Sequence, residues 1–275
     1  MQVNKDYQFL ILDIDGTLLN SQNELTKATY DRLMQLMADG YQLVLASGRP
    51  TASMLETARQ LKLDQAKSYI ISYNGAEITD MATQEVIYQK GLDDEDLRTI
   101  IEFNEAQGLS TIAYGPAEII IDRPNDHSEV EAFLTKLPYR YDAAYFEKIP
   151  PGQLKFIGVG AEERVEAANS ILNGQIGQAT TAITSLPFYL EYFHHQVSKG
   201  NAIKALVESL GYSVDQVVAC GDGNNDASMI QAAGLGVAMA NATDYLKSLA
   251  QEITLSNDED GLIPIMDKYF PSSKS

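Results

Sequence analysis

Short, almost wholly apolar runs alternate with amphipathic stretches over about the first 80 residues of the chain. The first run, Phe9–Leu12, contains no polar residue, which is typical of a parallel strand covered on both faces. The next stretch, 26–39, repeats apolar residues at helical spacing between a capping Thr26 and a terminating Gly40. Strand-like and helix-like stretches then follow in turn, at 41–49, 51–63 and 68–78. This β-α-β-α-β order predicts right-handed crossovers and a doubly wound parallel sheet.

The same alternation returns near the end of the chain. Helix-like stretches at 199–212 and 225–234 alternate there with strand-like runs at 214–223 and 235–240. Between about residues 83 and 188, several strand-like segments instead alternate apolar and polar residues, as a sheet with one exposed face does. The segments are 85–90, 110–114, 117–122, 154–160 and 188–193, with helices expected near 93–107 and 161–173. The sequence therefore predicts an α+β domain inserted into a loop of the parallel-sheet domain.

The composition narrows the class of partner and the compartment. With 38 acidic and 20 basic residues the net charge is −18, which repels nucleic acid and anionic membranes at long range. The one cysteine, Cys220, permits no intramolecular disulfide and no multi-cysteine zinc site. No stretch approaches the ~20 apolar residues of a membrane span, and residues 1–5 are polar. We expect a cytoplasmic protein with no nucleic-acid or membrane partner; the sequence carries no signal of its oligomeric state.

Histidine offers little support for a metal site. The chain has three histidines, and two of them, His194 and His195, are adjacent. Neighbouring side chains of a strand point to opposite faces, so we expect this pair to be a poor chelate.

The first apolar run ends in two aspartates, Asp13 and Asp15, followed by Gly16 and Thr17. Residues two apart on a strand share a face, so both carboxylates can project from the carboxyl end of the strand, where open α/β sheets bind ligands. Two close carboxylates repel unless a proton or a cation lies between them. The alternative is a strand end whose aspartates cap the next turn, with Asp-Gly as ordinary turn chemistry.

Two further stretches carry groups that suit an anion. Ser47 and Gly48 end the next predicted strand, and a hydroxyl with backbone N–H groups near a helix N-terminus suits an anionic oxygen. Lys199 lies near the start of a helix, where the helix dipole disfavours a cation. The alternatives are an ordinary Ser-Gly turn and a solvated surface lysine.

A fourth stretch, "CGDGNND" at 220–226, lies at the end of another apolar strand. Asp222 and Asp226 flank Asn224 and Asn225, and the glycines let backbone approach closely. The spacing is similar to the start of a calcium loop. The loop lacks the glutamate at its twelfth position and leads directly into a helix, which argues against an EF-hand.

All four stretches fall at strand carboxyl ends or at a helix start within one predicted sheet, and together they supply the groups that phosphoryl transfer needs. A carboxylate that attacks a phosphate monoester dianion meets charge repulsion, which Mg²⁺ held by carboxylates screens. A lysine and a hydroxyl hold the phosphoryl oxygens. One aspartate can form an acyl phosphate while the other manages the proton of the leaving group.

The motifs "DIDGTLL", "LASGR", "VSKG" and "GDGNND" resemble, in order and spacing, the four motifs of the haloacid dehalogenase (HAD) superfamily of phosphatases. The long insertion, "SYNGA" before it, and "GVAMANA" and "SNDEDG" near the end resemble the Cof-type, sugar-phosphatase-like branch. The resemblance covers essentially the whole chain. It implies a Rossmann-like, HAD-like core at residues 1–82 and 189–275, with an inserted cap domain at 83–188.

Carried over by position, the resemblance implies the residues of the reaction. Asp13 would be the nucleophile and the first Mg²⁺ ligand. Asp15 would be the general acid/base and would bind the metal through its backbone carbonyl. Lys199 would bridge phosphate and nucleophile, and Asp222 would complete the metal site.

The resemblance also implies the residues that hold the phosphoryl group. Ser47 and Gly48 would bind a phosphoryl oxygen, and Asn225 would contact the phosphate. Asp226 would orient its neighbours, with Thr17 as a further supporting residue. Five more residues lie near the motif boundaries, where they either line a pocket or simply pack: Arg49, Tyr73, Asn74, Glu191 and His195.

The predicted activity is Mg²⁺-dependent hydrolysis of a small phosphorylated metabolite. A capped site favours small phosphomonoesters, with sugar phosphates first, then pyridoxal phosphate and flavin mononucleotide. One alternative is a phosphotransferase on the same fold, such as a phosphomannomutase-like enzyme, which would return the phosphoryl group to a sugar. Another is a non-catalytic protein that binds metal or phosphorylated ligands; it predicts a missing nucleophile or lysine, whereas Asp13 and Lys199 are both present.

Overall fold

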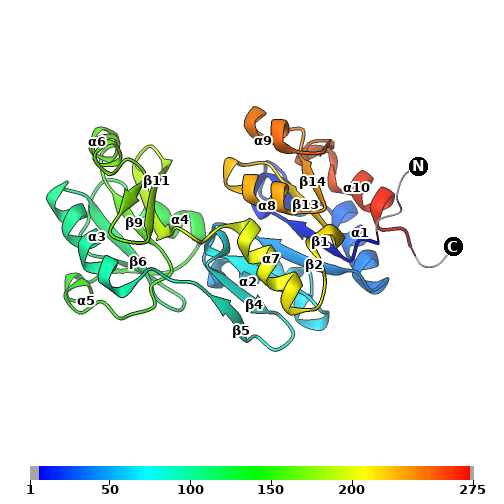
Figure 1. Cartoon of the computed structure of the whole chain (residues 1–275), viewed down its shortest axis with the longest axis horizontal. Helices are drawn as coiled ribbons and strands as arrows, with labels where there is room; N and C mark the ends of the chain where they lie inside the picture. The colour runs from blue at the N-terminus through cyan, green and yellow to red at the C-terminus, as the bar shows by residue number, and fades with distance from the viewer. Residues whose placement is uncertain (1–5, 273–275) are drawn as a thin grey trace. The chain divides into compact units, whose positions relative to one another are not determined.

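The computed structural model describes residues 6–272; the polar start predicted at residues 1–5 lies outside this range. The chain divides into two compact units, Met1–Tyr88 with Ser198–Ser275, and Gln89–Val197 (Figure 1). The sequence places the two boundaries earlier, at 82/83 and 188/189. Within the described range, no helix is long and apolar enough to cross a membrane.

The first unit is built on an eight-stranded sheet in the order β15-β14-β13-β1-β2-β3-β4-β5. Its strands are β1 (Phe9–Leu12), β2 (Gln42–Ala46), β3 (Tyr69–Ser72), β4 (Glu77–Asp80), β5 (Val86–Gln89), β13 (Val217–Gly221), β14 (Leu235–Ala238) and β15 (Glu252–Ile253). The six strands from β15 to β3 are paired in parallel, and β4 is antiparallel to β3. The predicted doubly wound parallel sheet is therefore confirmed.

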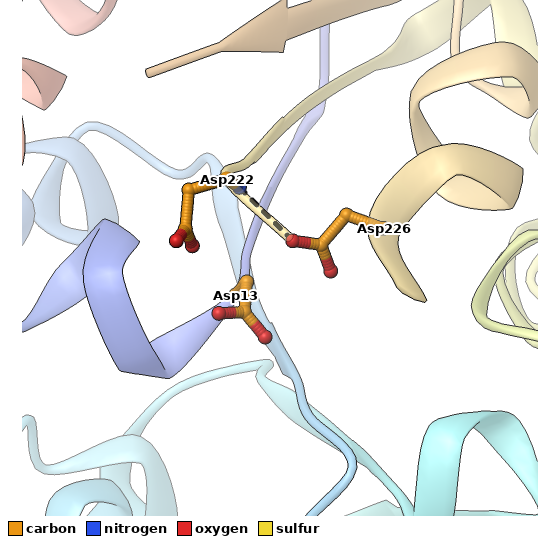
Figure 2. A group of neighbouring side chains, drawn as sticks. All are labelled: Asp13, Asp222 and Asp226. Atoms are coloured by element: carbon orange, nitrogen blue, oxygen red, sulfur yellow. Dashed lines mark hydrogen bonds between the residues drawn. The ribbon is translucent and has the colours of Figure 1, made fainter. Parts of the chain in front are cut away.

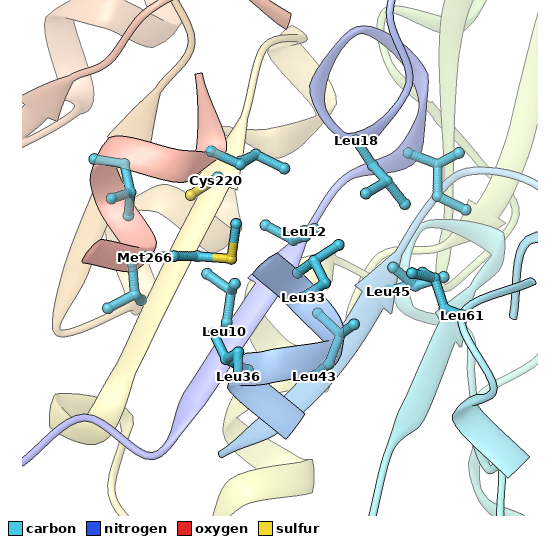
Figure 3. Close-up of a cluster of buried hydrophobic side chains, with 14 of the residues drawn as sticks. Leu10, Leu12, Leu18, Leu33, Leu36, Leu43, Leu45, Leu61, Cys220 and Met266 are labelled. Atoms are coloured by element: carbon cyan, nitrogen blue, oxygen red, sulfur yellow. The ribbon is translucent and has the colours of Figure 1, made fainter. Parts of the chain in front are cut away.

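Helices cover both faces of this sheet because successive residues of each strand point to opposite sides. Leu10 and Leu12 of β1 pack with three helices on one face: α1 (Lys27–Ala38), α2 (Thr51–Gln60) and α10 (Leu262–Tyr269) (Figure 3). Phe9 and Ile11 pack with three helices on the other: α7 (Lys199–Ser209), α8 (Ala227–Ala232) and α9 (Asp244–Leu249). Both faces of β1 are thus buried, as its apolar sequence predicts. The sequence does not predict α9, β15 or α10.

The strand order fixes where a ligand can bind. From β1 the chain adds β2 and β3 on one side, and later β13, β14 and β15 on the other. An open α/β sheet has its ligand crevice outside the carboxyl ends of the strands where the order reverses. In this sheet that point lies between β1, which ends at Leu12, and β13, which ends at Gly221.

One predicted strand is wrong. The sequence predicts a single strand over 68–78, but the structure has β3, a turn at Tyr73–Gly75 and then β4, which runs back alongside β3. All three residues of the turn have positive φ. Asn-Gly is a strong signal for a tight hairpin turn. The apolar residues on both sides of Asn74-Gly75 also fit one continuous strand, and this second pattern gave the wrong prediction.

The second unit contains a seven-stranded sheet in the order β10-β11-β12-β9-β6-β7-β8. Its strands are β6 (Ser110–Tyr114), β7 (Ile119–Ile121), β8 (Tyr139–Tyr141), β9 (Phe156–Val159), β10 (Gln175–Ile176), β11 (Thr180–Leu186) and β12 (Tyr189–His194). Its helices are α3 (Asp94–Ala106), α4 (Val130–Thr135), α5 (Ala143–Glu147) and α6 (Glu162–Leu172). All strand pairs are antiparallel except β7 with β8.

Two expectations for this unit need correction. Residues 183–185 of β11, a strand that the sequence does not predict, are exposed. The predicted strands β7 and β9 are buried throughout, so the sheet face expected to be exposed is covered there. Helix α4 packs on that face, where Ala132 joins a second apolar cluster. The rings of His194 and His195 stack with centroids 4.5 Å apart, because β12 ends at His194 and the strand alternation stops there.

Candidate active site

The candidate site lies at the carboxyl ends of β1 and β13. Asp13 directly follows β1, and its backbone N–H donates to the Cys220 carbonyl of β13 over 3.1 Å. Asp222 directly follows β13, and Asp226 ends the short turn that leads into α8. Residues more than 200 positions apart in the sequence are neighbours here because the two strands are parallel and adjacent.

Three carboxylates point toward one another at this place (Figure 2). Asp13, Asp222 and Asp226 each offer an oxygen, and these oxygens lie within 4.8 Å of one another. Asp13 is 5% exposed and Asp226 is fully buried. Three carboxylates this close repel unless protons or cations compensate their charge.

Lys199 supplies part of that compensation. Its ammonium lies 2.5 Å from Oδ1 of Asp13 and 2.6 Å from Oδ1 of Asp226, and the side chain is fully buried. Ser198 caps helix α7 by accepting the Asn201 N–H over 3.1 Å. The lysine at the start of this helix is therefore held between two carboxylates and is not solvated.

The pKa values in this cluster reflect burial first and the charges of neighbouring groups second. Burial, with the charge of Asp226, raises the pKa of Asp13 well above its ordinary value, and Lys199 opposes this shift. Burial raises the pKa of Asp222 to about 6, although the hydrogen bond from Thr17 opposes it. Burial would lower the pKa of Lys199, but Asp13 and Asp226 raise it above its ordinary value. One ammonium does not balance this cluster.

The hydrogen bonds distinguish the three aspartates. Both oxygens of Asp226 are occupied, Oδ1 by Lys199 and Oδ2 by the backbone N–H groups of Asp222 and Gly223, each at 3.0 Å. Thr17 donates to Oδ1 of Asp222 over 2.9 Å. Among residues 6–272, no donor meets Oδ2 of Asp13 or Oδ2 of Asp222. Two carboxylate oxygens without donors, in a cluster with surplus negative charge, fit a hard divalent cation.

Gly16 lets the loop after β1 approach the loop after β13 closely. Its φ is +77°, and a β-carbon at this position would lie 2.3 Å from Oδ2 of Asp222. Any side chain here would fill the space in front of that free oxygen. The Asp-Gly pair is therefore more than ordinary turn chemistry.

Asp15 lies apart from the three-carboxylate cluster. Its side chain is half exposed, and both of its oxygens are held by Arg49, from Nε at 2.8 Å and Nη2 at 2.5 Å. This bidentate pair fixes the direction of the carboxylate. From the sequence, Arg49 is only a residue near a motif boundary, because the reach of a long side chain leaves no signal in residue spacing.

The predicted phosphate-binding residues lie in neighbouring loops. Ser47 is buried directly after β2, and its Oγ accepts the Arg49 N–H over 3.2 Å. Asn225 is exposed, and its Nδ2 donates to Oδ1 of Asn74 over 3.4 Å. Gly48 packs against the side chain of Asn74. The structure thus joins Asp13, Thr17, Lys199, Asp222 and Asp226 by direct contacts, and links Gly48 and Asn225 through Asn74.

Two stretches near the end of the sequence, around Asn241 and Asn257, donate hydrogen bonds to the loop after β1. Asn241 donates to the carbonyl of Gly16 over 2.8 Å, and its own side-chain oxygen accepts the Asn257 N–H over 3.0 Å. Asn257 in turn donates to the carbonyl of Leu19 over 2.9 Å. The signal for these contacts was available in "GVAMANA" and "SNDEDG", which contain both asparagines.

Comparison with known proteins agrees with this site. The family model for haloacid dehalogenase-like hydrolases matches residues 10–266. YxeH of Bacillus subtilis (strain 168), whose name marks it as a candidate phosphatase, is 32% identical over 262 residues, 93% of this chain and 96% of YxeH. A haloacid dehalogenase-like hydrolase from Bacteroides thetaiotaomicron has a TM-score of 0.89 and 34% identity, covering 96% of this chain and all of that one. The subclass IIB sugar phosphatase BT4131 shares the fold, with a TM-score of 0.79 and 23% identity over 95% of this chain and 98% of that one.

The chain belongs to the family of haloacid dehalogenase-like hydrolases. The resemblance stated from the four motifs is thereby confirmed. The protein is an enzyme of the phosphoric monoester hydrolase class.

Proposed function

We propose that this enzyme hydrolyses small phosphomonoesters, sugar phosphates foremost, by Mg²⁺-dependent transfer of the phosphoryl group to Asp13. The observation that carries the proposal is the buried ammonium of Lys199, 2.5 Å from Asp13 at the reversal point of the sheet. A carboxylate held there beside a fixed cation is placed to attack an anionic phosphate.

In the first half of the reaction, an oxygen of Asp13 forms a bond to phosphorus. The bond between phosphorus and the oxygen of the leaving alcohol breaks, and the carboxyl of Asp15 gives its proton to that oxygen. Arg49 contacts both oxygens of Asp15 in this structure, which is the arrangement of an ionised carboxylate, so one of these contacts opens when Asp15 carries its proton and the other keeps the side chain directed. Lys199 stabilises the negative charge that gathers between the nucleophile and the phosphoryl oxygens.

In the second half, the carboxylate of Asp15 takes a proton from water. The water oxygen bonds to phosphorus, the acyl phosphate bond breaks, and Asp13 and inorganic phosphate are released. Ser47, Gly48 and Asn225 hold the phosphoryl oxygens in both halves. Asp226 keeps Lys199 and the loop after β13 in position through contacts from both of its oxygens.

The residues that would hold Mg²⁺ are Asp13, Asp222 and the backbone carbonyl of Asp15. Asp13 and Asp222 support this assignment, because each has an oxygen that no donor among the described residues meets. Asp226 is a poor ligand because both of its oxygens are occupied. When bound, the ion supplies charge screening for the phosphate dianion.

We assign substrate specificity to the inserted unit, predicted at 83–188 from the sequence and compact over Gln89–Val197. Sugar phosphates head the candidate substrates because a sugar phosphatase shares this fold. We place the enzyme in the cytoplasm, where small phosphorylated metabolites are found. Cell fractionation with antibody detection tests the location.

The deciding experiment measures phosphate release from a panel of sugar phosphates, pyridoxal phosphate and flavin mononucleotide. Wild type and Asp13→Asn are assayed with Mg²⁺ and with a chelator. We expect release that needs Mg²⁺ and falls by roughly 10⁵-fold or more in the variant, since removing a nucleophile removes the covalent path. Mg²⁺ binding without phosphate release, or isomerised esters without free phosphate, would replace this proposal with a binding protein or a mutase.

A further inference from the structure

The turn Tyr73–Gly75, between β3 and β4, has an unusual backbone. Its three residues have φ values of +49°, +57° and +106°. Left-handed backbone is uncommon outside glycine and is a genuine outlier for a bulky residue such as Tyr73. Such conformations persist where surrounding contacts hold them, and they concentrate at functional sites.

The backbone of this turn is tied to two loops of the candidate site. Tyr73 N–H donates to the Arg49 carbonyl over 2.9 Å, and Asn74 N–H donates to the Ser47 carbonyl over 3.0 Å. Gly75 packs against the start of α7, because a β-carbon on it would lie 2.3 Å from the carbonyl oxygen of Ser198. The turn therefore joins the loop after β2 to the residue before Lys199.

The side chain of Asn74 contacts a third loop. Nδ2 of Asn225 donates to Oδ1 of Asn74 over 3.4 Å. The same carboxamide lies on Gly48, where an added β-carbon would be 3.0 Å from Oδ1 of Asn74. The side chain of Asn74 thus touches two of the three residues to which we assign the phosphoryl oxygens, and its backbone N–H contacts the third, Ser47.

We propose that Asn74 is a positioning residue for the phosphoryl group, and that it acts by orienting Asn225. The inference rests on the proposed function. An exposed asparagine can present either its NH₂ or its carbonyl oxygen to a ligand, and only the NH₂ can donate to a phosphate. Asn74 accepts one N–H of Asn225 and thereby keeps the NH₂ group of Asn225 on the side of Asn74 and Gly48. The second N–H of that NH₂ group is then left for a phosphoryl oxygen. The opposite orientation would turn a carbonyl oxygen toward the dianion.

Asn74→Gly tests this directly, because glycine adopts left-handed backbone freely and the change removes the side chain with its carboxamide without straining the turn. We expect kcat/KM for a phosphoester to fall roughly 10- to 100-fold, as misplacement of a substrate-holding group does. The inhibition constant of inorganic phosphate should rise with it, and the melting temperature should stay near that of wild type. Asn173→Gly is the matched control: Asn173 is an exposed asparagine with φ +48° in the other unit, and its activity should be that of wild type.

A double-mutant cycle separates positioning from a merely structural role. If Asn74 acts through Asn225, then Asn74→Gly should add little to the loss already caused by Asn225→Ala. Losses that multiply in the double variant, or an Asn74→Gly enzyme as active as Asn173→Gly, would overturn the inference. Failure of the proposed function has a different signature, namely no Asp13-dependent phosphate release from wild type.

Discussion

Among residues 6–272, two lysines are buried against carboxylates, one in each unit. In the first unit, Lys199 contacts Asp13 and Asp226. In the second, Lys155 lies 2.9 Å from Oε2 of Glu191, and its side chain is 5% exposed. Burial would lower the pKa of Lys155, but Glu191 and Glu131 raise it above its ordinary value, as the aspartates do for Lys199.

The two regions differ in whether the carboxylate oxygens around the lysine have hydrogen-bond donors. The other oxygen of Glu191 accepts a hydrogen bond from Ser185 over 2.8 Å, and Glu131 accepts one from Tyr114 over 2.6 Å. Around Lys199, by contrast, Asp13 and Asp222 each keep an oxygen that no donor among residues 6–272 meets. A buried lysine therefore does not mark a catalytic site by itself. Carboxylate oxygens left free beside it do, because they are available to a cation or a substrate.

The largest expected difference between the two regions is in turnover. Lys199→Met removes the charge beside Asp13, the proposed nucleophile, and should lower kcat on the order of 10³-fold, the loss expected for a charge-stabilising contact. Lys155→Met should change the turnover of folded enzyme by less than about tenfold, since the ammonium of Lys155 pairs with Glu191 of its own unit. Phosphate release per folded molecule is the measurement. Equal losses in the two variants would erase the distinction.

In the second region, the loss of the buried lysine should lower the free energy of unfolding. Lys155→Met leaves the buried carboxylate of Glu191 without its cation, which costs about 3–5 kcal/mol. The double variant Lys155→Met/Glu191→Leu removes both charges and should recover much of this loss. Urea unfolding, with hydrogen exchange of the β9 and β12 amides as the local readout, measures it. A double variant as unstable as the single one would show that the ion pair is not the source.

Mg²⁺ should stabilise only the first region. At about 100 times its dissociation constant, the ion should raise the free energy of unfolding of wild type by about 2.7 kcal/mol. The increment should vanish in Asp13→Asn/Asp222→Asn and persist in Lys155→Met, which supplies the matched control. Thermal unfolding with Mg²⁺ and with chelator gives both values. An unchanged increment in the double aspartate variant would place the ion elsewhere.

A further effect concerns pH in the metal-free protein. The pKa of Asp222 is about 6 in the folded state against 3.8 for the free side chain, so between about pH 6 and pH 4 the folded chain binds more protons than the unfolded one. The contribution of Asp222 to stability therefore grows as pH falls through this window and is lost as pH rises. Asp222→Asn cannot titrate, and its melting temperature should be less sensitive to pH over the same range. Parallel curves for both proteins would contradict the assignment.

The sequence could predict the convergence of Asp13, Lys199 and Asp222, because the carboxyl ends of parallel strands share one edge of the sheet. It could not predict the pairing of Arg49 with Asp15, which depends on the reach of a long side chain. The sequence could not predict the ion pair of Lys155 with Glu191 either. The register between β9 and β12 brings these residues together, and residue spacing does not set that register. The turn at Tyr73–Gly75 was not predicted for a different reason: the apolar residues on both sides of it have the pattern of one continuous strand.

The pairing of β1 with β13 also sets an order of assembly. Residues 9–12 must pair with residues 217–220, whereas the unit Gln89–Val197 is one uninterrupted segment. During synthesis, which delivers the N-terminal part first, this segment can complete its sheet while β1 still lacks one of its two neighbours. Asp13, the proposed nucleophile, is thus made before the strand that positions Asp222 beside it, which follows roughly 200 residues later. Nascent chains that stop before β13 hold the aspartate without its active site, and with an open edge on the central strand of the sheet.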